Sequence, residues 1–195
     1  MPYGAVQDRE TKLTADAVRI NGAADLTAAD KSALLGIESS DASGLTALDT
    51  TIQGDTTLEE ARTDCKKIVS GYHVYALFDP QVHLVIAADA ISGANTKVSA
   101  LATQLQQKLD GNTNPAVKAA LADLAKHVAG SESAVTGVSS SVLALTPSGY
   151  PGNKPTLQTA QKSLTTARAD LKQARTDIDT IRDALKTVAT PSPAA

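Results

Sequence analysis

Aromatic residues are scarce in this chain of 195 residues: they make up 3% of it, with one phenylalanine and no tryptophan. Large rings therefore cannot fill the core, which has to be built from leucine, isoleucine, valine and alanine. Such a core suits closely packed helices. The overall composition, 42% hydrophobic and 20% charged, is that of a folded protein rather than of a disordered chain.

Positive charge is also sparse. The net charge is -3 and no block of lysine or arginine occurs, so we expect no nucleic-acid partner. No apolar run reaches the length of a membrane-spanning helix, and we expect no membrane span. The single cysteine, Cys65, can form neither an internal disulfide nor a CxxC motif and is expected to pack as a small apolar residue.

Recognisable catalytic motifs are missing. The sequence contains no GxSxG, Walker, GxGxxG, HExxH or EF-hand pattern. A DxxxH spacing occurs twice, at Asp79 with His83 and at Asp123 with His127, but the helical register separates the two histidines by about 20 Å. We therefore expect no catalytic residues, no metal site and no cofactor, and interpret Asp123 and His127 as a solvated pair.

Helical periodicity is the strongest positive feature. A heptad seam in residues 156–189 alternates leucine or isoleucine with smaller side chains, and it comprises Leu157, Ala160, Leu164, Ala167, Leu171, Ala174, Ile178, Ile181, Leu185 and Val188. The alanine side packs either inside the chain or against a second copy, which leaves a homo-oligomer open. Capping patterns at Thr57 with Glu60 and at Thr27 with Asp30 indicate further helix starts.

These patterns predict an all-α fold, an elongated antiparallel helical bundle of about five to six helices. Residues 57–109 are expected to form one long central helix bent at Pro80. Residues 1–54 are expected to form N-terminal helices packing on 57–79, residues 80–190 a C-terminal three-helix bundle that shares the central helix, and residues 191–195 a proline-rich tail. A chain reversal at Pro80 is the alternative, because the residue before a proline is pushed away from helical geometry.

The stretch GYHVYALFDPQVHLVIAAD, residues 71–89, is apolar in almost every direction of a helical wheel, which predicts that other helices surround it. Tyr75, Asp79 and His83 share one stripe of this helix, and the hairpin register places Tyr150 beside them. These four residues are the candidate ligand-binding site. The competing interpretation is that they only fill space and satisfy one another's hydrogen bonds.

A second polar cluster is expected where two helices meet. The register places Glu38 and Asp41 opposite Tyr72 and His73. A carboxylate beside histidine and tyrosine could form a general acid-base group, although such clusters more often only satisfy polar atoms at a helix contact.

Three segments, YHVYALFDPQVHLVIAAD (72–89), ALTPSGYP (144–151) and AQKSLTTARADLKQAR (160–175), resemble actinobacterial secreted or surface α-helical bundle proteins of uncharacterised function. The similarity covers roughly the last two-thirds of the chain. It implies export, to the medium or the cell surface. No activity and no functional residue comes with the resemblance.

Together these observations favour a non-enzymatic extracellular helical scaffold or interaction module, acting on an unknown protein or cell-surface partner. The alternative is a binding protein for a small hydrophobic or aromatic ligand at the Pro80 junction. An enzyme that uses the acid, histidine and tyrosine cluster is a more distant third.

Overall fold

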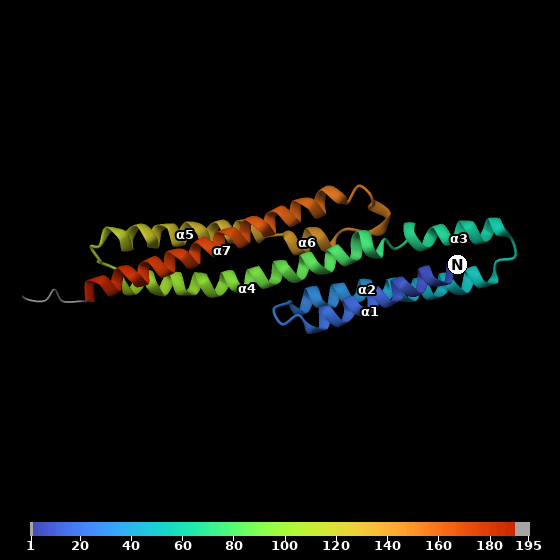
Figure 1. Ribbon diagram of the computed structural model, residues 1–195, viewed down its shortest axis with the longest axis horizontal. Helices are drawn as coiled ribbons and strands as arrows, with labels where there is room; N and C mark the ends of the chain where they lie inside the picture. Colours follow the sequence, from blue (N-terminus) through green and yellow to red (C-terminus); the bar gives the residue numbers. More distant parts are fainter. Residues whose placement is uncertain (1, 190–195) are drawn as a thin grey trace, which may run out of the picture. The chain divides into compact units, whose positions relative to one another are not determined.

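The computed structural model describes residues 2–189, and within this range the chain contains helices, turns and loops but no strand (Figure 1). The elements are α1 (Pro2–Gly22), α2 (Ala28–Gly54), α3 (Leu58–Ser70), η1 (Val74–Phe78), α4 (Asp79–Lys108), α5 (Pro115–Val135), α6 (Val138–Leu143), η2 (Pro147–Gly149) and α7 (Lys154–Ala189). The predicted all-α bundle is confirmed. The proline-rich tail, residues 191–195, lies outside the described residues.

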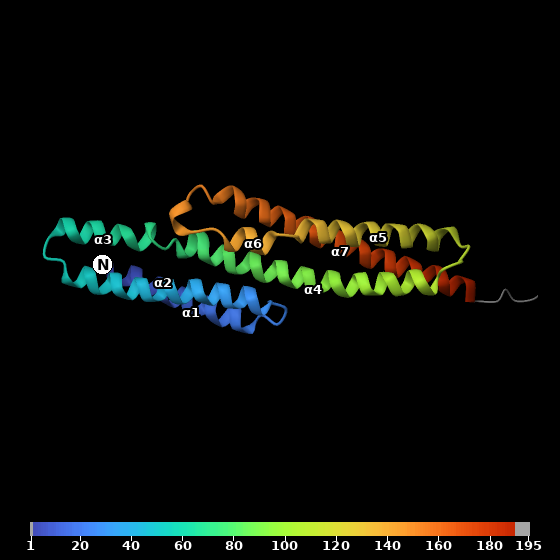
Figure 2. The ribbon, with the colours of Figure 1, turned by 180° about the vertical axis from the view of Figure 1, so that it is seen from behind.

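The chain forms two compact units. The first unit comprises residues 2–90 and 137–161, and the second comprises residues 91–136 and 162–189. The boundary therefore falls inside α4, about three turns after the expected division at residue 80. The difference arises because α6 and the loop that follows it fold back along the first turns of α4 (Figure 2).

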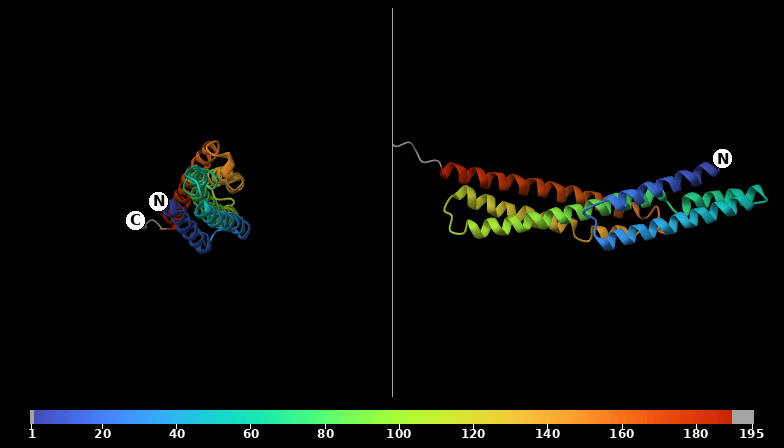
Figure 3. Two further views of the ribbon diagram at one scale, coloured as in Figure 1. Left: turned by 90° about the vertical axis from the view of Figure 1, so that its right-hand side faces the viewer. Right: turned by 90° about the horizontal axis from the view of Figure 1, so that it is seen from below.

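In the first unit, α1 and α2 form an antiparallel hairpin, and α2 turns back into α3 (Figure 3). Both predicted capping signals are present. The Thr27 hydroxyl accepts a hydrogen bond from the Asp30 backbone N–H at 3.2 Å. At α3, Thr57 and Glu60 form a reciprocal capping box, with Glu60 Oε2 accepting from the Thr57 N–H at 2.9 Å. These caps mark the starts of α2 and α3. The short turn at residues 55–57 joins the two helices in antiparallel orientation.

The central helical segment runs from Leu58 to Lys108 without a chain reversal, but it is interrupted before Pro80 rather than at it. His73 has a left-handed backbone with φ of 47°, and the following turn, Val74–Phe78, is a π-helix. Proline has no N–H, and its ring crowds the carbonyl four residues earlier. A widened π-turn relieves that crowding, so the irregular geometry lies one to two turns upstream of the proline.

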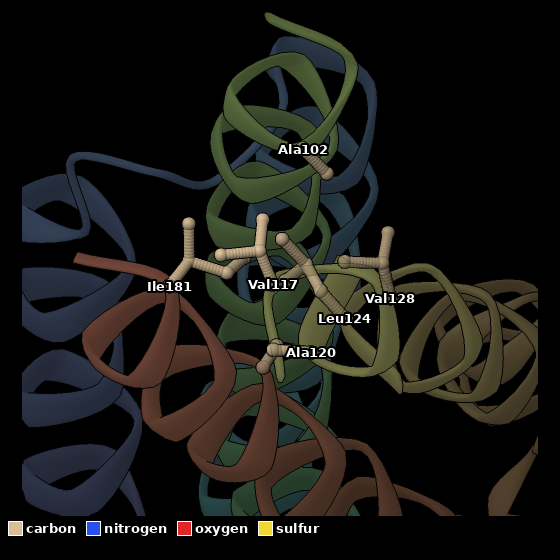
Figure 4. Close-up of a cluster of buried hydrophobic side chains, with 7 residues drawn as sticks. Ala102, Val117, Ala120, Leu124, Val128 and Ile181 are labelled. Atoms are coloured by element: carbon tan, nitrogen blue, oxygen red, sulfur yellow. The ribbon is translucent and has the colours of Figure 1, made fainter. Parts of the chain in front are cut away.

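The second unit is a three-helix core of α4, α5 and α7 (Figure 4). Its buried side chains are Ala102, Val117, Ala120, Leu124, Val128, Ala174 and Ile181. On α7, Ala167 and Ala174 are fully buried while Leu171 is half-buried. The alanine side of the heptad pattern thus packs inside the chain, where small side chains let the neighbouring helices approach closely.

Within the described residues, one helical stretch, Leu58–Lys108, is long and apolar enough to cross a membrane by length and composition alone. Half of its most apolar 18-residue window is buried inside the protein. A core helix of a folded bundle has the same composition, because its neighbours cover most of its faces.

Leu124→Ala tests the core of the second unit. Leu124 has no exposed surface, so its truncation should leave a cavity and lower the free energy of unfolding by about 2 to 5 kcal/mol. Leu101 is 39% exposed, and Leu101→Ala should cost less than about 1 kcal/mol. Urea denaturation measures both, and equal losses in the two variants would contradict this core.

Candidate ligand-binding site

A pocket of about 420 Å³ opens in the first unit. Its walls come from α2, from the interrupted segment around η1 with the start of α4, and from the chain between α6 and η2. The lining residues are Ala33, Gly36, Ile37, Ser40, Asp41, Tyr72, Leu77, Phe78, Gln81, Leu143, Leu145, Thr146 and Pro147. We call this space the α2 pocket. Its volume and its mainly apolar lining are typical of small-molecule sites.

Two amide side chains hold the loop wall of the α2 pocket. Gln81, only 1% exposed, donates hydrogen bonds from Nε2 to the carbonyls of Val142 at 2.8 Å and Leu145 at 3.0 Å. Asn153 Nδ2 donates to the Thr146 carbonyl at 2.7 Å. The last carbonyls of a helix have no partner inside that helix. Gln81 thus binds the last turn of α6 and Leu145 just after it, Asn153 binds the loop that follows, and together they fix the path of the chain beside the pocket.

Asp41 is the charged residue of the pocket wall. It is 9% exposed, and its Oδ2 has no hydrogen-bond partner anywhere in the described chain. Burial, with the nearby carboxylate of Glu38, raises the pKa of Asp41 to about 6. Burial and the charge of Asp41 also raise the pKa of Tyr72. The wall therefore holds a negative charge that the protein itself leaves uncompensated.

The ring of Tyr72 packs against α2 at Gly44, where the helix carries no side chain. A Cβ atom at Gly44 would lie 2.6 Å from the Tyr72 hydroxyl oxygen, closer than side-chain contacts allow. Because Gly44 has no side chain, the tyrosine ring can pack directly on the helix, one turn from Asp41. A Cβ at Gly36, also on α2, would meet no atom within 4 Å.

The predicted polar cluster is assembled in part. Asp41 and Tyr72 line the α2 pocket together, and Glu38 acts on Asp41 through its charge. His73 is not among the lining residues, and its ring instead packs on that of Tyr150, with the ring centroids 4.3 Å apart. Burial lowers the pKa of His73, which favours the neutral imidazole. An acid, histidine and tyrosine group does not converge in this pocket.

Tyr75, from the predicted ligand stripe, faces α1. It is 49% exposed, its hydroxyl donates to the Asp8 carbonyl at 3.0 Å, and the guanidinium of Arg9 lies 5.6 Å from its ring centroid. Tyr150 lies in the loop before α7 with Lys154 Nζ 5.2 Å from its ring centroid. Neither tyrosine lines the α2 pocket.

Asp79 and His83 belong to an ion-pair network between α4 and α1. His83 Nε2 lies 3.3 Å from Asp79 Oδ1, and Asp79 also pairs with Lys12. The buried Asp16 accepts hydrogen bonds from Lys12 at 2.6 Å and from Arg19 at 2.7 Å. These contacts join the two helices. A ligand-binding role for Asp79 and His83 stays a prediction, because neither residue lines the pocket.

The sequence predicted where along the central helix this site lies, but not which residues line it. The hairpin register placed the loop around Tyr150 beside Asp79, and Thr146 and Pro147 of that loop line the pocket with Phe78. Gln81 and Gly44 were missed. Gln81 lies in the apolar-all-round stretch, where a lone amide is itself a signal of a buried hydrogen-bonding partner. Gly44 carried no signal, since a glycine inside a helical pattern has many explanations.

Two further polar features lie elsewhere. His127 pairs with Asp177 of α7 across 2.8 Å rather than standing as a solvated pair with Asp123. Among residues 2–189, no group of three or more histidine, cysteine, aspartate or glutamate side chains is placed to hold a metal ion.

Comparison of the chain with protein-family models, with curated proteins and with solved structures finds no match.

Gly44→Ala tests the placement of Tyr72. Alanine in place of glycine inside a helix gains about 0.5 to 1 kcal/mol, and Gly36→Ala should show this stabilisation because its Cβ meets open space. Gly44→Ala should instead lower the free energy of unfolding by about 1 to 2 kcal/mol relative to the native protein, since the added methyl group forces Tyr72 to move. Urea denaturation compares the two variants. Equal stabilisation by both would show that Tyr72 does not pack on Gly44.

Asp41→Asn tests the charge in the wall. Because the pKa of Asp41 is raised to about 6, the folded protein binds a proton more readily than the unfolded chain, and stability falls as the pH rises from about 4 to 6. Asparagine does not ionise, so the stability of the Asp41→Asn variant should not fall in this way between about pH 4 and pH 6. At pH 7 it should be more stable than the native protein by about 1 to 2 kcal/mol, a value reduced for solvent screening.

The same comparison at low pH supplies the control. Below about pH 4 the native Asp41 is protonated in both states, so the advantage of Asp41→Asn should vanish. Asp25→Asn, which removes the same charge at an exposed position outside the pocket, is the matched control. A constant difference between Asp41→Asn and native protein from pH 4 to pH 7 would contradict the assignment.

Proposed function

We propose that this chain is a binding protein for a small, largely apolar molecule that occupies the α2 pocket. The observation that carries the proposal is Asp41, whose carboxylate lies in the wall of the pocket and has one oxygen, Oδ2, buried without a partner among the described residues. Burial of an unpaired charge opposes folding, and functional sites are where such groups concentrate. A ligand that supplies the missing partner gives this residue a role that packing alone does not.

The lining supports a molecule with an apolar body and a polar end. Ile37 on α2 and Leu77 with Phe78 on η1 give apolar surface from two elements, and the chain from the end of α6 to η2 adds Leu143 and Pro147. Polar groups are fewer and come mainly from Ser40, Asp41, Tyr72 and Thr146. Specific small-molecule sites combine a mainly apolar wall with a few polar groups that fix orientation.

Export to the medium or the cell surface is part of the proposal, and it rests on the resemblance of residues 72–89, 144–151 and 160–175 to secreted or surface helical proteins. A binding protein in that location would meet small molecules from outside the cell.

A second proposal is a scaffold or interaction module that acts through its surface on a protein or cell-surface partner. The supporting observation is a pair of exposed apolar side chains, Val69 and Tyr75, 52% and 49% exposed, which flank a hollow of about 60 Å³ beside Arg9. Contiguous exposed apolar surface marks sites where protein partners attach. In this case the α2 pocket would bind no small molecule.

A panel of small aromatic and aliphatic compounds, screened by thermal shift, tests the leading proposal. A ligand that binds the folded state raises the melting temperature by mass action. Gly36→Leu should abolish that rise, because its side chain would extend from an open position in the pocket wall. Gly4→Leu is the matched control, since a Cβ at Gly4 also meets no atom within 4 Å but lies on α1, outside the pocket.

At least one compound should therefore stabilise the native protein and Gly4→Leu but not Gly36→Leu. If no compound in the panel stabilises the protein in this pocket-dependent way, the binding proposal is wrong.

A further inference from the structure

We propose that the α2 pocket recognises an organic cation, a primary or secondary ammonium group on an apolar body, with the ammonium placed against Asp41. This inference rests on the proposed function and adds the chemical class of the ligand.

The charges around the pocket are of one sign. Asp41 lines the wall and Glu38 lies one turn earlier on α2. The lining set contains no lysine, arginine or histidine within the described chain. An anionic ligand would meet repulsion from both carboxylates, and a neutral ligand would leave the charge of Asp41 without a partner. A cation is the ligand that compensates it.

The hydrogen-bonding pattern favours a cation that carries N–H groups. Asp41 Oδ2 has no donor among the described residues, and the hydroxyl groups of Ser40 and Tyr72 line the same pocket. A primary ammonium group offers three donors and no acceptor. Hydrogen bonds from a charged donor to a carboxylate are stronger than neutral ones. A quaternary ammonium would supply the charge but no hydrogen-bond donor to the Asp41 carboxylate.

A metal ion fits this site less well. In the part of the chain that the structure describes, no three acidic, histidine or cysteine side chains converge on one point. The walls beyond the carboxylate are apolar, with Leu77 and Phe78 among them. Such walls offer no further ligands for a metal ion, whereas they accept the hydrocarbon part of an amine.

Ligand binding should follow the ionisation of Asp41. Burial and Glu38 raise its pKa to about 6, so the carboxylate is charged at pH 7.5 and mostly protonated at pH 5. The titratable groups that face it are Glu38, on the same helix, and Tyr72, from the turn before η1. From α4 the pocket receives the neutral Gln81, and residues 143–147 contribute no titratable side chain. An ammonium ligand is therefore held at neutral pH and released in acid.

The test compares two molecules of nearly the same shape, the 2-phenylethylammonium ion and the neutral 2-phenylethanol. Both are titrated into ¹⁵N-labelled native protein and followed by NMR at pH 7.5 and at pH 5. At pH 7.5 the ammonium should bind about tenfold more tightly than the alcohol, the size expected for a charge-assisted hydrogen bond. At pH 5 that advantage should be lost.

Three variants test whether Asp41 causes the preference for the ammonium ion over the alcohol. Asp41→Asn should lose the preference for the ammonium over the alcohol at pH 7.5. Glu38→Gln should weaken the preference less, because Glu38 acts only through its charge on Asp41. The exposed Asp25→Asn, with the same change of net charge, should keep the native preference and its pH dependence.

The outcomes separate this inference from the proposed function. If the alcohol binds the native protein but not Gly36→Leu, and the ammonium binds no more tightly, cation recognition is wrong while binding in the α2 pocket stands. Failure of the ammonium to bind at millimolar concentration also overturns cation recognition. The wider compound panel then decides the proposed function separately.

Discussion

The amide group of Gln81 is the contact on which the pocket depends. It is buried on the first turn of α4, and both of its hydrogen bonds go to carbonyls at the end of α6. Those carbonyls come from Val142 and Leu145, so one side chain fixes both the end of the short helix and the loop that follows. This contact, together with the hydrogen bond from Ser139 on α6 to Asp89 on α4, sets the distance of the third wall of the α2 pocket from α4.

The irregular backbone before Gln81 also shapes the α2 pocket. A continuous helix through Pro80 would set the proline ring against a carbonyl, and the π-turn at Val74–Phe78 removes that conflict. The left-handed His73 directs the chain into this turn and brings its own ring onto Tyr150. The interruption lies where α2, η1 and the loop after α6 meet, and the pocket lies there too.

Asp41 opposes the stability of the fold that contains it. An asparagine of the same shape would avoid the unfavourable charge, and a leucine would add apolar contact. Gly44 shows the same pattern, since alanine would be the better helix former if Tyr72 did not occupy the space. Two residues on one helix thus favour the geometry of the pocket over the stability of the helix. Such conflicts between local preference and structure are expected at functional sites.

Local signals in the sequence predicted the helices well. The capping box at Thr57 and Glu60 and the cap at Thr27 depend on residues close in the chain, and periodicity fixes which helix positions are buried. The hairpin register also predicted that the loop around Tyr150 would lie beside this part of the central helix. The spacing of Tyr75 and Asp79 correctly placed both on one face, but that face contacts α1 and not the pocket.

The remaining features could not be obtained in this way. Which face of a helix meets a given neighbour depends on its rotation about its own axis, and spacing along the chain does not fix that rotation. The π-turn changes the rotation again at the point where the site forms. For the same reason the partner of His127 is Asp177, fifty residues away, and not Asp123 on its own helix.

The most direct test of this account is the titration of the Asp41 side-chain carboxyl carbon, followed by ¹³C NMR in the folded protein and assigned with Asp41→Asn. An uncompensated carboxylate in the pocket wall predicts a midpoint near pH 6, which moves to lower pH when 2-phenylethylammonium is added. A midpoint at or below about pH 4, unchanged by the ammonium ion, would show that Asp41 is solvated or already paired, and would contradict the account.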